Sequence, residues 1–171
     1  MALNAVLGDT NQNSYVTELE ADSYFEDRAY SDKWDELDDL SKEPLLILCS
    51  RTIDWYVKWK GFKKSADQPM EWPRTSVILR DGSTVSDSVL PKAVKIAVFE
   101  QVLFAIDKDP TLTDPLLGLE EIKVSTLSLR AKPDQSGKRT TSKSSIPEKV
   151  WKILEDLRSS SSFGVVRLMR G

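Results

Sequence analysis

The sequence has no histidine among its 171 residues and a single cysteine, Cys49. The absence of histidine removes the commonest general base of enzymes and the commonest zinc ligand. The nucleotide-binding and hydrolase patterns GxxxxGK[ST], GxGxxG and GxSxG are also absent. These absences leave no candidate catalytic, cofactor-binding or metal-binding residue. We therefore expect a noncatalytic protein that uses no cofactor.

Export and membrane signals are scarce as well. One cysteine cannot form a disulfide within the chain, and Cys49 lies in the apolar run LLILCS, where a buried thiol is expected. Residues 1–13 have no basic start and no apolar run long enough for export or insertion. We expect a protein made in the cytoplasm that has no membrane partner.

Charge is divided unevenly along the chain. Residues 1–43 carry 12 acidic and 3 basic side chains, whereas residues 130–171 carry 10 basic and 4 acidic ones. The middle of the chain has 11 of each, so the net charge of −3 conceals an acidic N-terminal part and a basic C-terminal part. This polarity is compatible with head-to-tail contact between copies, with a tail near nucleic acid, or with two separately solvated surfaces.

Apolar periodicity predicts a mainly α-helical fold, a small helical bundle with long loops. A first helix is expected after Thr17, where Glu20 would complete a capping box. A long helix is expected from Ser41, with Pro44 in its first turn, and a second core helix after Pro91. One short β-strand or hairpin is expected near 121–130, followed by an extended C-terminal tail.

The same patterns divide the chain into five parts. They are a flexible N-terminal arm (1–13), a helical domain with the β element (14–130), a basic mobile loop (131–145), a short amphipathic helix (146–158) and a C-terminal tail (159–171).

A long loop-like stretch between the two core helices contains the segment MEWPRT. Pro73 lacks an N–H group and restricts Trp72 to extended backbone, so neither belongs inside a helix. Trp72 could stack on a base while Arg74 holds a phosphate, but we expect Trp72 and Pro73 to anchor the loop on the core. Trp55 and Trp59 could likewise form an aromatic platform, but their helical spacing is more typical of core residues.

Several short motifs occur in a characteristic order: SYVTELEADSYF, IDWYVKWKG, EWPRTSV followed by RDG, LPKAVKIAVFEQVL and GLEEIKVSTLSL. This order, over about residues 14–130, resembles a family of small tailed-phage proteins. Its members are often labelled DnaT-like single-stranded-DNA-binding proteins, yet they resemble head-tail connectors, the adaptors of the virion neck. The resemblance implies a structural virion protein, assembled in the host cytoplasm, that forms a dodecameric ring under the portal. The ring would contact the tail terminator, stopper or tail-tube protein, and double-stranded DNA would pass through its lumen.

The connector interpretation assigns roles to three groups of residues. The C-terminal peptide would dock on the portal, although a frayed end is an equal alternative. Cations of the basic loop would face DNA in the lumen, and Arg74 and the β element would contact neighbouring subunits. The portal-binding residues would be Phe163, Val165, Val166, Arg167, Leu168, Met169 and Arg170; the lumen residues Lys138, Arg139 and Lys143; and the further subunit contacts Ile122, Val124, Leu127 and Leu129.

The alternative function is a DnaT-like single-stranded-DNA-binding replication protein. It predicts salt-dependent binding to oligonucleotides and weaker binding after Trp72→Ala or Trp55→Ala. A dedicated single-strand binder has a basic groove interleaved with exposed aromatic side chains, which the net charge of −3 does not suggest. The composition therefore favours the connector over the replication protein.

Overall fold

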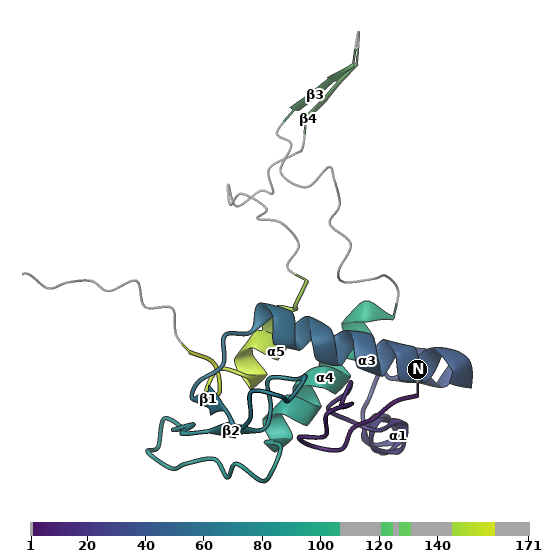
Figure 1. Ribbon diagram of the computed structural model, residues 1–171. Helices are drawn as coiled ribbons and strands as arrows, with labels where there is room; N and C mark the ends of the chain where they lie inside the picture. Colours follow the sequence, from purple (N-terminus) through teal and green to yellow (C-terminus); the bar gives the residue numbers. More distant parts are fainter. Residues whose placement is uncertain (1, 107–120, 125–126, 131–144, 160–171) are drawn as a thin grey trace, which may run out of the picture.

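The computed structural model describes residues 2–106, 121–124, 127–130 and 145–159 (Figure 1). Helices dominate the described part, which confirms the expected mainly helical class. The five described helices are α1 (Glu18–Glu26), α2 (Asp32–Asp35), α3 (Asp39–Tyr56), α4 (Lys92–Ala105) and α5 (Glu148–Ile153). None of the helices in these ranges is both long and apolar enough to cross a bilayer.

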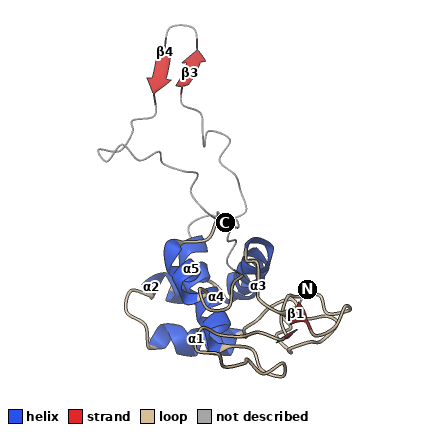
Figure 2. Ribbon diagram, turned by 90° about the vertical axis from the view of Figure 1, so that its left-hand side faces the viewer, coloured by secondary structure: helices blue, strands red, loops and turns tan. Residues whose placement is uncertain are grey.

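The bundle is built around α4, which packs against both α3 and α5, while α3 also contacts α1. Figure 1 shows α3 along one edge of the body. Figure 2 shows the helices gathered on one side and the long loops, with β1, on the other. Most of α4 is buried, because its apolar side chains face neighbours on nearly every side.

Local sequence signals account for the helix starts. Thr17 Oγ1 accepts a hydrogen bond from the Glu20 N–H at 3.2 Å, and the Thr17 N–H donates to the Glu20 carboxylate at 3.1 Å, so the predicted capping box is confirmed. Pro91 and Pro147 occupy the N-cap positions of α4 and α5. The exception is α3, which begins at Asp39 and contains Pro44 inside the helix rather than in its first turn.

Two short antiparallel strand pairs complete the described structure. Strand β1 (Phe62–Lys63) pairs with β2 (Arg74–Thr75), which closes the loop that carries MEWPRT. Strands β3 (Glu121–Val124) and β4 (Leu127–Arg130) form the hairpin expected near 121–130, with Val124 opposite Leu127. In the sequence, the alternation of apolar and polar residues breaks at Ser125 and Thr126, which separate these two strands.

Trp72 lies fully buried in the core. Its ring meets that of Trp59 edge to face, with the ring centroids 5.6 Å apart. Trp59 is 7% exposed, so the two indoles join the segment after α3 to the MEWPRT loop. A second aromatic cluster, formed by Tyr24, Phe25, Trp34 and Phe99, joins α1 and α2 to α4.

The N-terminal residues differ from the flexible arm that the sequence suggested. Gln12 and Asn13 are buried, and the Asn13 side chain accepts a hydrogen bond from the Asn4 N–H at 2.8 Å and donates to the Ala2 carbonyl at 3.0 Å. Side-chain amides thus satisfy the turning backbone of this segment, a role that polarity alone did not reveal. The Leu3 N–H also donates to the Glu43 carboxylate at 3.4 Å, which joins the segment to α3.

Several predicted residues lie outside the described part. Among them are the cations Lys138, Arg139 and Lys143 and the whole portal-docking peptide of residues 163–170. The backbone of the β3–β4 hairpin is described, but the side chains of Ile122, Val124, Leu127 and Leu129 are not.

Candidate nucleic-acid interface

The last turn of α3 carries two exposed aromatic rings. Trp55 is 66% exposed and Tyr56 is 48% exposed. Thr52 and Ile53 are buried on the inner side of the same turn, and the helical repeat then turns Trp55 outward. The helix stops at Tyr56 because Val57 adopts extended backbone and buries its side chain.

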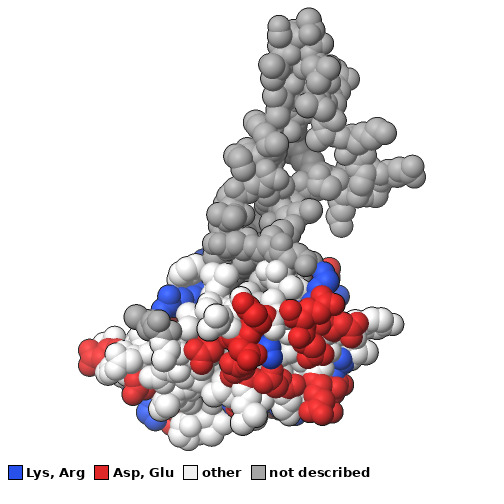
Figure 3. Space-filling view, turned by 90° about the vertical axis from the view of Figure 1, so that its right-hand side faces the viewer, with Lys and Arg blue, Asp and Glu red and all other residues white. Residues whose placement is uncertain are grey.

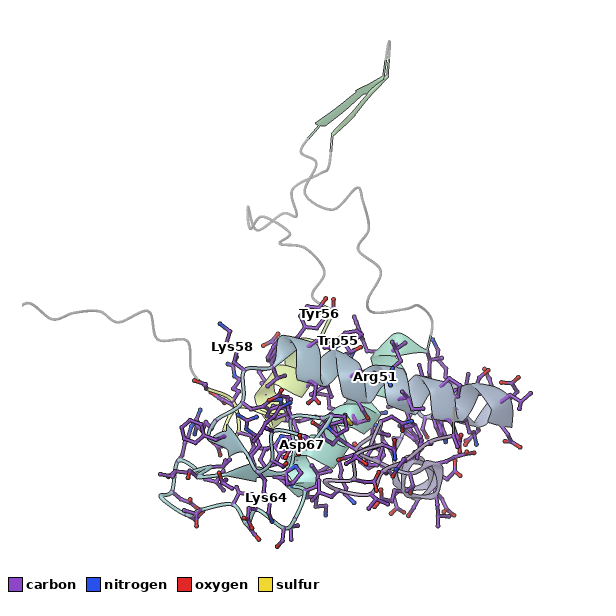
Figure 4. All side chains as sticks on the ribbon, in the orientation of Figure 1. Arg51, Trp55, Tyr56, Lys58, Lys64 and Asp67 are labelled. Atoms are coloured by element: carbon purple, nitrogen blue, oxygen red, sulfur yellow. The ribbon has the colours of Figure 1, made fainter. Side chains whose placement is uncertain are left out.

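Basic side chains flank the two rings. Arg51 lies one helical turn before Trp55, Lys58 follows the end of the helix, and both are exposed. Figure 4 shows Trp55 and Tyr56 at the outer edge of α3, with Arg51 further along the helix and Lys58 beyond its end. Lys64 and Asp67 lie below the helix in this view, away from the rings. Arg51, Trp55, Tyr56 and Lys58 are called the α3 platform below.

Two contacts hold the platform in place. The Ser145 hydroxyl donates a hydrogen bond to Tyr56 Oη at 3.1 Å, which joins the start of the α5 segment to the ring. Lys58 lies in an extended segment whose carbonyl accepts a hydrogen bond from the Ser159 N–H at 2.7 Å. The platform therefore rests on both α3 and the residues around α5.

Acidic side chains gather at the other end of α3. Figure 3 views the molecule from the end where α3 begins, and Asp and Glu cover much of that face. A polyanion would be repelled from this end and tolerated at the platform. The exposed carboxylates near the start of α3 are Glu26, Asp27, Asp32, Asp35, Glu36, Asp38 and Asp39.

A half-buried carboxylate, Asp54, precedes Trp55 in α3. The Tyr15 hydroxyl donates to Asp54 Oδ1 at 2.5 Å, and the Glu71 N–H donates to Asp54 Oδ2 at 2.9 Å. The Trp72 N–H in turn donates to Tyr15 Oη at 3.2 Å. Burial raises the pKa of Asp54 to about 6, although both hydrogen bonds oppose the rise. Burial, followed by the Asp54 charge, raises the pKa of Tyr15 well above its ordinary value.

The raised pKa of Asp54 predicts a pH-dependent stability. The folded chain binds a proton at Asp54 more readily than the unfolded chain does, so the free energy of unfolding should fall as pH rises from about 4 to about 6. We expect this residue to contribute a loss of about 1–2 kcal/mol over that range. Urea unfolding followed by circular dichroism at several pH values would measure it. Asp54→Asn should flatten the dependence, whereas the exposed Asp67→Asn should leave it unchanged; identical pH curves for all three proteins would contradict the assignment.

The Arg74 side chain holds the β1–β2 loop together. It is 7% exposed, and its guanidinium donates to the carbonyls of Lys60 and Gly61, each at 2.8 Å, and to the carbonyl and carboxylate of Glu71. These contacts engage the guanidinium within the chain, whereas the predicted contact of Arg74 with a neighbouring subunit stays a prediction. A guanidinium with several donors is well suited to holding loop carbonyls together.

Trp55 was predicted to lie in the core, and that prediction is wrong. The inner face of α3 is formed by Leu46, Cys49, Ser50, Thr52 and Ile53. Two of these are small polar residues, and Ser50 is satisfied because its hydroxyl accepts a hydrogen bond from the Tyr15 N–H at 3.1 Å. The prediction rested on the spacing of four between Trp55 and Trp59, but α3 ends at Tyr56, so Trp59 lies beyond the helix and the two rings do not share a helical face. Arg51 lies one turn before Trp55 on the same side of α3, and this charged residue was the signal that the side faces solvent.

The exposed side chains of the platform suit the binding of a ligand. Within the ranges described above, no group of three or more Cys, Asp or Glu side chains could hold a metal ion. The platform combines flat apolar rings with two cations, which is the combination that stacks on bases and pairs with phosphates.

Comparison with known proteins bears on this surface. A family model described as "Putative DnaT-like ssDNA binding protein" matches residues 1–171. No curated protein and no solved structure matches the chain. The family description points to contact with DNA and overturns the head-tail connector interpretation. The portal and tail partners implied by that interpretation lose their support with it.

Proposed function

The chain belongs to the family of DnaT-like ssDNA-binding proteins, and from this premise we propose that it binds single-stranded DNA at the α3 platform. It acts in this proposal as a noncatalytic binding protein. The observation that carries the proposal is the exposure of Trp55 and Tyr56 between two cations, at the end of α3 opposite the carboxylates that surround its start.

Base stacking supplies most of the binding in this proposal. An indole that is 66% exposed leaves much of its apolar surface in water, and a base that stacks on it removes part of that surface. Stacking on an aromatic side chain contributes about 1–3 kcal/mol per base and tolerates any base, because every base has a π face. Two adjacent rings therefore suit a short, sequence-tolerant contact. Duplex DNA presents no free base faces to them.

Arg51 and Lys58 supply the phosphate contacts. Two cations make a small electrostatic contribution, so the salt dependence should be shallow, with log K falling by about 1.4 per decade of salt. The proposed contact is therefore driven more by stacking than by charge. This division explains how a chain of net charge −3 can bind a polyanion locally.

Replacing Trp55 by alanine should weaken single-stranded DNA binding about 5- to 100-fold, because one stacking face is lost. Fluorescence anisotropy of a labelled oligothymidylate titrated with the full chain would measure the change. Trp55→Phe keeps a ring and should retain most of the affinity. The matched control is Tyr30→Ala, which removes a ring that is 93% exposed but lies outside the platform.

Three results would contradict the proposal. They are an affinity that does not change in Trp55→Ala, an equal loss in Tyr30→Ala, and equal affinity for the same sequence as a duplex. Trp72 is fully buried and cannot stack on a base, so it is not a member of the proposed site.

A further inference from the structure

The outward face of α3 is apolar well beyond the platform. Leu40 is 87% exposed, Pro44 is exposed, and Ile47 and Leu48 are half-buried. With Arg51 and Trp55 they follow one line along the helix, because steps of three and four residues return to the same side. These six residues are called the α3 stripe below.

The stripe is long and carries little charge. From Leu40 to Trp55 it extends about 22 Å at 1.5 Å per residue, and Arg51 is its only charged member. A contiguous apolar face on the surface of a water-exposed helix is unusual unless something covers it. Among the described residues, Leu40, Pro44, Arg51 and Trp55 are exposed and Ile47 and Leu48 are half-buried, and none of the six is among the residues that pack against the core.

The two ends of the stripe differ in charge. Asp38 and Asp39 lie at its start, with further carboxylates on the preceding residues, whereas Arg51 and Lys58 lie near its end. A second copy of the same helix, turned through a half-rotation, would place its basic end against the acidic end of the first. The surface is therefore complementary to itself in the antiparallel orientation and repulsive to itself in the parallel one.

We propose that two copies of this chain associate through their α3 stripes, antiparallel about a two-fold axis between Ile47 and Leu48. In this register Leu40 lies opposite Trp55 of the second copy, and Pro44 lies opposite Arg51 of the second copy. The carboxylates of Asp38 and Asp39 then lie near Lys58 of the second copy. Each contact occurs twice, as in any isologous dimer.

The size of the stripe sets the strength of the dimer. A single pair of helices buries less than the roughly 1,200–2,000 Å² of a standard stable interface. The dimer should therefore be weak, with a dissociation constant in the micromolar range or above, and should exchange with the monomer. Because Trp55 belongs to both the stripe and the platform, the dimer covers the ring on which a base would stack. This overlap makes self-association and single-stranded DNA binding mutually exclusive, an inference that rests on the proposed function.

Sedimentation velocity of the full chain over a range of concentrations tests the dimer. The wild type should shift from monomer toward dimer as concentration rises. Leu40→Glu replaces the apolar side chain that packs on Trp55 of the second copy with a carboxylate that the contact would bury, and it should weaken the dimer at least about 10-fold. Leu19→Glu makes the same change on α1 at a site that is 79% exposed but off the stripe, and should leave the dimer unchanged.

Three results would overturn the proposal. The first is a wild-type chain that is monomeric at every concentration, as expected if the chain's own residues 107–144 cover the stripe. The second is an equal effect of the two leucine substitutions. The third is a dimer that strengthens in high salt despite the opposed charges.

Cross-linking tests the orientation. A Leu40→Cys variant mixed with a Trp55→Cys variant should form a mixed cross-linked dimer, because the two positions face each other in the antiparallel register. The Leu40→Cys variant alone should cross-link poorly. The reverse result would mean a parallel pair and would overturn the proposal. Cys49 is fully buried and supplies no competing surface thiol.

The same experiments separate this inference from the proposed function. Oligothymidylate should convert the dimer to monomer, and Leu40→Glu should bind it at least as tightly as the wild type does. If Leu40→Glu weakens the dimer but no oligonucleotide binds, the dimer is supported and the proposed function is contradicted. If oligonucleotide binds to a chain that never dimerises, the proposed function is retained and the dimer is overturned. If DNA binds to an intact dimer, the mutual exclusion is overturned.

Discussion

Replacing Trp72 with alanine is expected to lower the free energy of unfolding by about 3–5 kcal/mol, since a large buried ring is lost and a cavity remains. Trp72 is fully buried and contacts Trp59 edge to face, and its backbone N–H, which alanine would keep, donates to Tyr15 Oη. The cavity would open where the MEWPRT loop meets the core. Urea unfolding followed by circular dichroism would measure the change.

The natural control is the same chemical change at an exposed indole. Trp55→Ala should alter the free energy of unfolding by less than about 0.5 kcal/mol, because its ring is largely in water. Equal losses for the two variants would mean that Trp72 does not anchor the loop. Folded Trp72→Ala protein should still bind oligothymidylate, which separates the loop anchor from the proposed platform.

Glu100→Gln is expected to lower the free energy of unfolding by about 2–3 kcal/mol, because the Glu100 carboxylate joins three helices. Glu100 lies on α4 and is 6% exposed. Arg28 Nε donates to it at 2.9 Å, the Tyr24 hydroxyl at 2.8 Å, and Lys149 Nζ lies 2.7 Å from the same oxygen. The amide would leave two cations without their counter-charge. Burial alone would raise the pKa of Glu100, but the hydrogen bonds from Arg28, Lys149 and Tyr24 outweigh it and lower the pKa to about 2.

The lowered pKa gives this prediction a pH signature. The stabilisation is fully present above the ordinary glutamate pKa and is lost as pH falls from about 4.5 toward 2. Wild type and Glu100→Gln should therefore differ in stability at neutral pH and converge in acid. The exposed Glu26→Gln on α1 is the control and should track the wild type throughout. A Glu100→Gln difference that persists undiminished at pH 2 would show that the charge is not responsible.

Local signals in the sequence were sufficient for much of the fold. The capping box at Thr17, and the prolines at positions 91 and 147, act through neighbouring backbone and need no knowledge of the rest of the chain. The alternation of Ile122 with Val124 and of Leu127 with Leu129 likewise predicted a strand or hairpin there, and the structure has the hairpin. Helix starts and tight turns are decided within a few residues, so they could be predicted from those residues.

The candidate site depended on long-range contacts and was largely missed. Which side of α3 faces inward depends on Ser50 meeting Tyr15, a residue far away in the chain, so the apolar pattern alone placed Trp55 incorrectly. The burial of the Arg74 guanidinium depends in the same way on distant groups, the carbonyls of Lys60 and Gly61. The ordered motifs identified the family, but the connector role inferred from its members was wrong. Family membership could be recognised from the sequence, whereas the exposure of one ring could not.

Under the proposed function, the separation of charge between the two ends of α3 also affects how the molecule meets single-stranded DNA. A strand of DNA approaching in solution repels the acidic end and attracts Arg51 and Lys58 before any atoms touch. The protein therefore tends to rotate during the encounter until the platform leads, which raises the fraction of collisions that are productive. The acidic end also remains unattractive to a second strand. One protein chain would then bind one DNA strand without bridging it to a second strand.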